Sequence, residues 1–509
     1  MGPNGPVPPP ATYSLAAGRL GAPALTFIAL AAAVPLSVVT ITTPLGYATR
    51  GVPFFPLTFL FVGLVLLLFA VGYAAMARRS PNAGALYSFI ARGLGRPTGI
   101  GGAWLALLSY NALQIGLYGA VGLAAAPLLD SWFGVGAPWL AVAGGCWVVV
   151  TLCGLLRVEL VGAILALVVL AEVAVITGYG AAGLLEPAGG RITEDTLNLS
   201  WSAADRPAVG LLLVVAAFGF IGFETTAVYG EESQRPRRSI ARAAYASVVA
   251  LAVLYCFSAW ALSVAAGPSQ VGDLAAERGG ELMFDLIGAR LAPWAVTLGR
   301  VLLLTGLVAG MISLHHTIAR YAFALGREGV LPSRLARTGA RTSVPFHASA
   351  AQSAVAFLAL VGAYAAGWDP FTQLYPWLTA AGALGVLVLI LAASLSALLF
   401  LNRAPNGEGA WRQFLAPALA TILLGGLVYL AFAALPELLG VPAGDWLVVA
   451  VPAAYATAVA FGMSYGWALR RLRPITYAGI GLGGTAVVVA PAIPKPRAPG
   501  RHRAERVEP

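Results

Sequence analysis

Charged residues are scarce in this chain of 509 residues, because Asp, Glu, Lys and Arg together make up only 10% of it. Hydrophobic residues make up 59%, and the mean hydropathy is +0.82. A soluble globular domain carries far more charge, so the composition excludes that class and indicates an integral membrane protein. Strand-like alternation of apolar and polar residues is also absent, and the apolar runs are too long for the strands of a membrane β-barrel.

Lysine and cysteine are rare as well. Lys495 is the only lysine, and Cys146, Cys153 and Cys256 all lie in apolar runs. An odd number of cysteines in lipid gives neither a disulfide framework nor metal-ligand spacing. The run Gly99–Gly102 follows no predicted strand, so it is not a nucleotide-binding loop. We therefore expect no metal, no cofactor and no ATP-driven pump.

Long apolar runs dominate what is present. A helix needs about 20 apolar residues to cross a bilayer. The sequence predicts twelve such spans, at residues 23–47, 53–77, 99–126, 138–156, 160–184, 207–229, 243–266, 293–321, 346–366, 373–400, 414–434 and 445–469. Together these spans are expected to form a single all-α permease domain over residues 19–470. Residues 1–18 and 471–509 are rich in Pro, Gly and Arg, and we expect them to be disordered tails.

The basic residues predict the orientation of the chain. If the N-terminus lies in the cytoplasm, only six arginines fall on the outer side, namely Arg50, Arg191, Arg206, Arg278, Arg290 and Arg300. The positive-inside rule then places both termini in the cytoplasm of a plasma-membrane protein. The net charge of +10 is a topology signal spread over several inner loops, so we expect no nucleic-acid partner. The first span follows no charged segment, which distinguishes it from a cleaved signal peptide.

Two of the predicted spans contain helix-breaking residues. Span one carries Pro35 and Pro44, and span six carries Gly219, Gly222 and a carboxylate at Glu224. Five spans separate the two breaks, as in a five-plus-five inverted repeat with a solute site between its halves. Proline and glycine are also common in ordinary membrane helices, so the breaks alone do not establish the repeat.

Three stretches strengthen that interpretation. They are RRSPNAGALYSFIARGLGRPTGIGGAW (78–104), FGFIGFETTAVYGEESQRPRRSIARA (218–243) and RYAFALGREGVLPSRLARTGARTSVP (320–345). In order and in side of the membrane they resemble three inner-loop motifs of the amino acid–polyamine–organocation (APC) permeases. The resemblance covers about residues 20–470. It implies a leucine-transporter-like fold with discontinuous helices 1 and 6, and transport by a bacterial permease.

The resemblance also implies where a substrate would bind. The family's glycine-rich turn in span one falls on Leu36, Ser37 and Val38, whose backbone N–H groups would hold a carboxylate. Here only the serine is kept, and the alternative is a simple proline kink. In span six the matching carbonyl groups are those of Phe218, Gly219 and Ile221, and the alternative is a glycine pair that packs helices.

Other polar and aromatic residues are weaker candidates. Tyr110 and Gln114, one helical turn apart, would line the pocket or form interhelical hydrogen bonds. Phe220, or Phe218 beside it, would serve as an aromatic gate. Trp377 would cap the pocket or lie at the membrane interface.

Two carboxylates fall inside spans, Glu172 and Glu224. A charge in hydrocarbon is costly, so such a carboxyl group can bind and release a proton, and we expect one or both to couple transport to protons. A sodium site at Glu172 and a neutral, hydrogen-bonded Glu172 are the alternatives. His315 and His316 point apart on one helix, which favours structural hydrogen bonds over a metal site.

On the inner face, the arginines at 235, 237 and 238 could pair with Glu231 and Glu232, but a solvated cluster that sets the topology is the favoured alternative. The whole sequence thus predicts a secondary transporter for an amino acid or related amine, driven by protons. Exchange of two amino acids and polyamine transport stay open, as does a channel or sensor. An enzyme is disfavoured, because Ser37 has no evident base.

Overall fold

The computed structural model describes residues 14–50, 54–79, 83–197, 206–339, 342–405 and 407–483. Within these ranges the secondary structure is helical, and one isolated parallel bridge joins Leu20 to Ser233. Eleven of the helices found there are long and apolar enough to cross a membrane, and the apolar helix Trp139–Cys153 has 15 residues. The fold is therefore that of an all-α polytopic membrane protein.

The twelve predicted spans correspond to the following helices. Span one comprises α1 (Ala22–Ala33), α2 (Pro35–Ser37), a π-helical turn (Val38–Thr42) and α3 (Thr43–Arg50). Spans two to five are α4 (Phe55–Arg79), α6 (Arg96–Phe133), α7 (Trp139–Cys153) and α8 (Val158–Leu185). Span six comprises α9 (Arg206–Gly219) and a 3₁₀ segment (Phe223–Tyr229). Spans seven to twelve are α10 (Pro236–Ala266), α13 (Pro293–Arg327), α14 (Phe346–Ala365), α15 (Tyr375–Arg403), α16 (Ala416–Ala433) and α18 (Trp446–Leu472).

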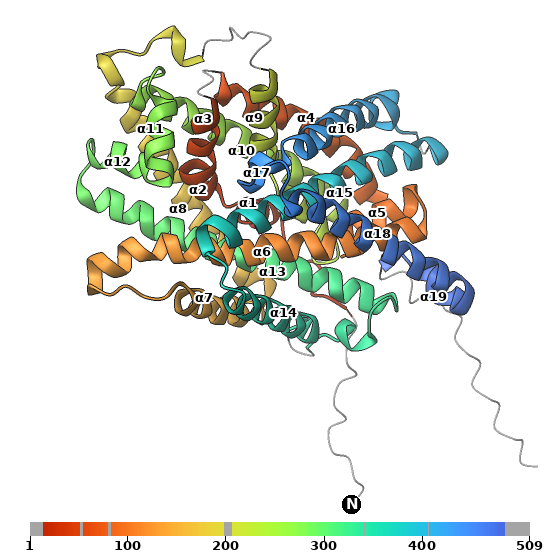
Figure 1. Cartoon of the computed structure of the whole chain (residues 1–509). Coiled ribbons are helices and arrows are strands. Elements are labelled where there is room, and N and C mark those ends of the chain that lie inside the picture. The colour runs from red at the N-terminus through yellow and green to blue at the C-terminus, as the bar shows by residue number, and fades with distance from the viewer. Residues whose placement is uncertain are drawn as a thin grey trace, which may run out of the picture.

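Shorter elements connect these spans. They are α5 (Ala85–Gly93), α11 (Val271–Arg278), α12 (Leu282–Gly288), α17 (Leu435–Leu439) and α19 (Pro474–Gly479), the 3₁₀ turns Ala188–Gly190, Glu194–Leu197, Gly279–Glu281 and Ser333–Ala336, and the π-helical turns Pro370–Leu374 and Trp411–Leu415. In Figure 1, α11 and α12 lie at one end of the bundle, whereas α5 and α19 lie at the opposite end. The connecting elements thus gather at two ends, as expected for helices that cross a membrane.

Eleven of the twelve predicted spans are confirmed as helices long enough to cross a membrane, and two of the twelve differ most from the prediction in length. The predicted span 138–156 forms only the 15-residue α7. The predicted span 99–126 is part of a 38-residue helix, α6, which continues past Pro127. A proline removes one hydrogen bond of the helix but does not always end it, so the helix extends beyond the apolar run.

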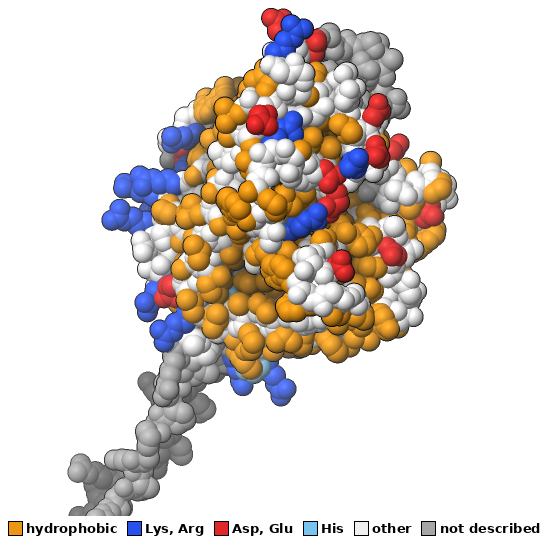
Figure 2. Space-filling view, turned by 90° about the vertical axis from the view of Figure 1, so that its left-hand side faces the viewer, with side chains coloured by type: hydrophobic (Ala, Val, Ile, Leu, Met, Phe, Trp, Pro, Cys, Tyr) orange, Lys and Arg blue, Asp and Glu red, His pale blue; other side chains and the backbone are white. Residues whose placement is uncertain are grey.

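The two broken spans lie at the centre of the bundle. In span one and in span six, 78% of the residues in the most apolar stretch are buried inside the protein. The corresponding share is 22% for α18 and 33% for α8. The outer helices present large apolar side chains, among them Leu64, Leu167 and Ile422. Figure 2 shows hydrophobic side chains over much of one face, with arginines along its left edge. Apolar side chains thus face outward as well as inward, which is the pattern of a lipid-embedded protein.

Candidate functional site

Span one is broken at Val34. This residue ends α1 in the left-handed conformation (φ 48°, ψ 65°), and Pro35 begins the next helical segment. A β-branched residue rarely adopts a positive φ, and the strain costs about 1–3 kcal/mol. The break thus lies directly before Pro35, and the predicted turn residues Leu36, Ser37 and Val38 follow it as the start of the next helical segment. Pro35 has no backbone N–H and therefore interrupts the helical hydrogen bonds without the two family glycines.

The packing around Val34 keeps this strained turn in place. A Cβ atom added at Gly310 of α13 would lie 2.4 Å from Cγ2 of Val34. The glycine therefore makes room for the valine side chain. After the break, Val38–Thr42 form a π-helical turn, which is often found at functional sites.

Span six is broken between Gly219, where α9 ends, and Phe223, where a 3₁₀ helix begins. Gly222 has φ +126°, a conformation that L side chains rarely adopt. A Cβ atom here would lie 2.7 Å from the backbone carbon of Ala32 and 2.7 Å from the backbone nitrogen of Ala33. The two breaks therefore lie against each other, backbone to backbone, at the centre of the bundle.

A cavity of about 170 Å³ lies between the two breaks. Five of the predicted binding residues line it: Ser37, Val38, Phe218, Gly219 and Ile221. Further lining residues come from spans three, eight, ten and α17 and from the rest of spans one and six: Ala32, Ala33, Val34, Ile41, Thr42, Leu45, Leu113, Leu117, Val215, Leu314, Tyr375, Pro376, Thr379, Ala380, Ala383 and Leu438. None of these lining residues is charged. The cavity suits a small solute whose charges are met by backbone groups.

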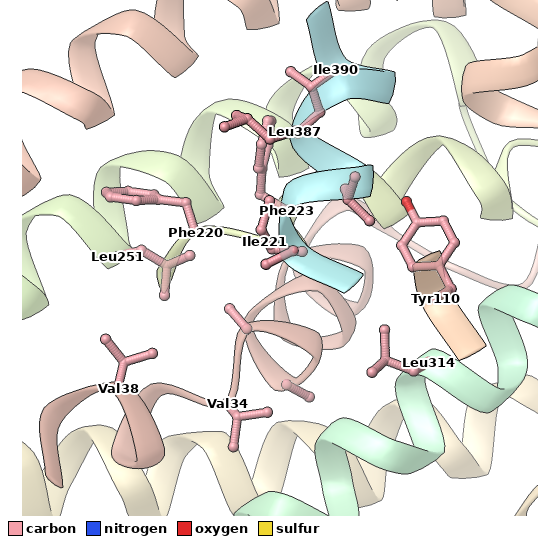
Figure 3. Close-up of a cluster of buried hydrophobic side chains, with 14 of the residues drawn as sticks. Val34, Val38, Tyr110, Phe220, Ile221, Phe223, Leu251, Leu314, Leu387 and Ile390 are labelled. Atoms are coloured by element: carbon pink, nitrogen blue, oxygen red, sulfur yellow. The ribbon is translucent and has the colours of Figure 1, made fainter. Parts of the chain in front are cut away.

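Five other predicted site residues do not line this cavity. Leu36 and Phe220 are buried beside it, and in Figure 3 Phe220 points away from Ile221 toward Leu251. The Phe220 ring packs on Tyr255, with ring centroids 5.8 Å apart, and Trp377 packs on Trp368. Tyr110 and Gln114 make interhelical hydrogen bonds, the alternative that the sequence left open. Span three instead contributes Leu113 and Leu117 to the cavity.

Sequence reasoning named Trp377 of span ten but missed the two residues of that span whose hydroxyl groups lie at the cavity. Tyr375 and Thr379 line the cavity one helical turn apart, and their hydroxyl groups are among its few polar atoms. The spacing of four residues is visible in the sequence. Tyr and Thr are common on many membrane helices, however, so the spacing does not distinguish these two residues.

Glu224 lies directly after the break in span six and is fully buried. Its Oε1 accepts a hydrogen bond from the Tyr110 hydroxyl (2.9 Å), and its Oε2 accepts one from the backbone N–H of Gly222 (2.8 Å). The Tyr73 hydroxyl donates to the Glu224 carbonyl (2.6 Å) and accepts from the backbone N–H of Ala227. Tyr73 of span two thus satisfies backbone groups that the broken helix leaves free, whereas Tyr110 of span three bonds to the Glu224 side chain.

Glu172 of α8 is also buried, but it lies outside the cavity. Its Oε1 has no hydrogen-bond partner in the described part of the chain, and it points at Gly306 of α13. A Cβ atom at Gly306 would lie only 1.8 Å from that oxygen. An unpaired buried carboxyl group is costly and requires an explanation. Its position between spans five and eight makes it the stronger candidate for ion coupling, because Glu224 already has two donors.

Two ion pairs join span eight to the loop after span six. Arg320 of α13 pairs with Glu232 through its Nε (2.5 Å) and its Nη2 (2.8 Å), and the side chains of both are 2% exposed. Arg327 pairs with Glu231 (2.8 Å). These glutamates therefore do not pair with the arginines at 235, 237 and 238, which are exposed, as the favoured alternative of a solvated cluster predicts. A helix begins at Pro236, and it carries those side chains away from the glutamates.

The chain on either side of these ion pairs adds backbone contacts. The N–H groups of Arg19 and Leu20 donate to the Glu232 carbonyl, and the N–H of Gln234 donates to the Leu20 carbonyl. The segment before span one is thereby tied to the loop after span six.

The two adjacent histidines serve as hydrogen-bonding groups. His315 Nε2 lies 2.8 Å from the Ser349 hydroxyl, and His316 Nε2 lies 3.2 Å from the Cys153 carbonyl. His316 also contacts Arg320 through its Nδ1 (3.0 Å). No cluster of three or more His, Cys, Asp or Glu suited to a metal occurs within the residues that the structure describes.

Comparisons with known proteins assign the class. The profile of the amino acid permease family matches residues 20–463, so the chain belongs to this family, which is part of the APC superfamily. It is a multi-pass membrane transporter. The resemblance inferred from the three inner-loop motifs is confirmed.

Individual relatives are distant. The chain is 25% identical over 386 residues to the gamma-aminobutyric acid permease of Escherichia coli (strain K12). This alignment covers 73% of this chain and 79% of the relative. It is 26% identical over 360 residues to the probable GABA permease of Pseudomonas aeruginosa, covering 66% and 70%. It is 25% identical over 286 residues to the low-affinity putrescine importer PlaP of Escherichia coli (strain K12), covering 54% and 60%.

Proposed function

We propose that this permease takes up amino acids or related amines by alternating access, coupled to protons. The observation that carries the proposal is the cavity between the two broken spans at the centre of the bundle. A central site between discontinuous helices is the arrangement in which many secondary transporters bind their substrates. The ion pairs Arg320–Glu232 and Arg327–Glu231, which join span eight to the loop after span six, support an inner gate, and no charged group lines the cavity, which supports a transporter rather than an enzyme.

The proposed binding mode uses backbone groups. Span one restarts at Pro35, and no side chain caps the helical segment that follows. The N–H of Ser37, which lines the cavity, would therefore be a donor for a carboxylate, with the Ser37 and Thr379 hydroxyls beside it. The carbonyl groups around Phe218, Gly219 and Ile221 would accept from the ammonium group.

The relatives point to linear amines as substrates, whereas the cavity lining favours a molecule with a single ammonium group. GABA and putrescine, named for the relatives, are linear amines. A diamine carries two positive charges, and no carboxylate lines the cavity to meet the second one. The lining therefore favours a molecule with one ammonium and one carboxylate, with polyamines as the second candidate.

Proton coupling is assigned to Glu172, with Glu224 as the second group. The unpaired Oε1 of Glu172 beside Gly306 supports a site that alternately binds and releases a cation. Sodium at the same position is the competing ion, because a carboxylate is a hard oxygen ligand. Exchange of two solutes would need neither ion.

The arginine distribution supports a plasma-membrane orientation with both termini in the cytoplasm. The face closed by the Arg320–Glu232 pair is then the cytoplasmic one, and the cavity belongs to an inward-closed state. The permease domain would cover residues 19–470, flanked by tails at 1–18 and 471–509. Residues 1–13 and 484–509 of these tails lie outside the described residues.

Uptake into proteoliposomes tests the proposal, with labelled L-leucine, GABA and putrescine as probes. Each is measured with and without an inward proton gradient and with and without sodium. Accumulation that collapses with the proton gradient supports the proposal and identifies the substrate. Uptake only into vesicles preloaded with amino acid would replace it with exchange. Uptake that follows sodium would reassign the coupling ion.

A further inference from the structure

Five buried side chains lie in a row between the broken sixth span and the inner face. They are Glu224, Tyr110 of α6, Tyr321 of α13, Tyr87 of α5 and Glu328, which directly follows α13. Their exposed fractions lie between 0 and 4%. The row consists of three buried tyrosine hydroxyls with a carboxyl group at each end. Packing alone does not require these hydroxyls, because Phe in place of each Tyr would fill the same space and leave no polar atom unpaired.

The first contact in the row is a hydrogen bond. The Tyr110 hydroxyl donates to Glu224 Oε1 over 2.9 Å. The next two contacts are between rings: Tyr110 and Tyr321 have centroids 5.7 Å apart, and so have Tyr321 and Tyr87. The hydroxyls of Tyr110 and Tyr321 also interact with each other.

The inner end of the row is Glu328. The Tyr87 hydroxyl and the Glu328 carboxyl group interact electrostatically, and Arg327 and Arg92 are the charged neighbours of that carboxyl. Glu328 Oε1 accepts from the backbone N–H of Gly483 over 3.0 Å, so the segment after α19 covers this end. Burial raises the pKa of Glu328 to about 7, against the opposing effect of the N–H groups and Arg327. The group therefore gains and loses a proton near neutral pH.

The hydroxyl groups in the middle of the row are only weakly held. Those of Tyr87 and Tyr321 form no hydrogen bond of ordinary geometry with the residues described here, and outside the row the Tyr321 hydroxyl contacts the backbone of Leu86. Such a hydroxyl can turn toward the neighbour on either side, which a proton relay requires.

We propose that Glu224, Tyr110, Tyr321, Tyr87 and Glu328 form a buried path that carries protons between the broken sixth span and the inner face. The path rests on the proton coupling proposed above and assigns its inner route. At each tyrosine one O–H bond forms on the side of Glu224 while another breaks on the side of Glu328. The tyrosines end neutral, and one proton has moved from carboxyl to carboxyl.

The test uses Tyr321→Phe in the full-length protein, because this change removes one hydroxyl from the middle of the row. Proteoliposomes filled with a pH-sensitive dye receive whichever probe, L-leucine, GABA or putrescine, the wild type takes up. Substrate-driven acidification is expected to fall at least ten-fold, whereas exchange of labelled for unlabelled probe stays within two-fold of the wild type. Retained exchange shows that the variant is folded and binds substrate.

Matched variants sharpen the result. Tyr118→Phe also removes a buried, unpaired hydroxyl from α6, but outside the row, and should leave both rates unchanged. Tyr87→Phe should reproduce Tyr321→Phe. Glu328→Gln removes the inner carboxyl group of the path and should lower acidification as Tyr321→Phe does. Full acidification by Tyr321→Phe would overturn the path while leaving proton coupling intact. Uptake by the wild type without acidification would overturn the coupling, and the path with it.

Discussion

Replacing Gly222 by alanine tests whether the contact between the two breaks shapes the site. The new Cβ would lie 2.7 Å from backbone atoms of Ala32 and Ala33, and ordinary contact begins at 3.4 Å. Span one must therefore move by about 0.7 Å. In addition, alanine at φ +126° is strained by about 1–3 kcal/mol. Displacements of this size at a binding site reduce rates by about ten-fold or more.

The assay is uptake into proteoliposomes together with thermal unfolding in detergent. Gly222→Ala should lower the unfolding temperature and reduce uptake at least ten-fold. Gly178→Ala on α8 is the matched control, because a Cβ there meets no atom within 4 Å. It should change neither quantity. Wild-type uptake by Gly222→Ala would refute the idea that the two breaks form one rigid unit.

Three further predictions concern buried charges. Arg320→Ala leaves the carboxylate of Glu232 buried and unpaired, which should cost about 3–5 kcal/mol, whereas the double change Arg320→Met with Glu232→Leu should recover most of it in a thermal unfolding assay. Glu172→Gln should abolish proton-driven accumulation but keep exchange in the uptake assay. Gly306→Ala should act similarly, because the new Cβ displaces the carboxyl group of Glu172. Because burial raises the pKa of Glu328 from 4.5 to about 7, the folded state binds the extra proton, so stability should fall by about 3 kcal/mol as pH rises from 4.5 to 7. Glu328→Gln should remove that part of the pH dependence; an unchanged unfolding profile would contradict it.

Hydropathy was sufficient to predict the twelve apolar helices, because the cost of exposing backbone groups to lipid leaves few alternatives. The position of the first break was harder to predict. The family pattern places it at Ser37, but Val34 adopts a left-handed conformation that propensity alone does not indicate for valine. Only the packing against Gly310 explains why this conformation is tolerated.

The ion pairs show a different limit of sequence reasoning. Glu231 and Glu232 pair with Arg327 and Arg320, about 90 positions away, rather than with the nearest arginines. Tertiary contacts of this kind determine which charged residues pair, and separation along the sequence does not predict them. Phe218, Gly219 and Ile221 line the cavity, because the helix break and the cavity arise from the same local glycine pattern, and the role of their carbonyl groups stays a prediction.

The dryness of the Arg320–Glu232 pair has a consequence for the timing of transport. Separating two ions that are 2% exposed requires water to enter the inner passage at the same moment. When the transporter opens on the side of this ion pair, the number of bound water molecules therefore increases. Osmolytes that withdraw water from the vesicle interior should slow turnover, while leaving the affinity measured from the outer side unaltered.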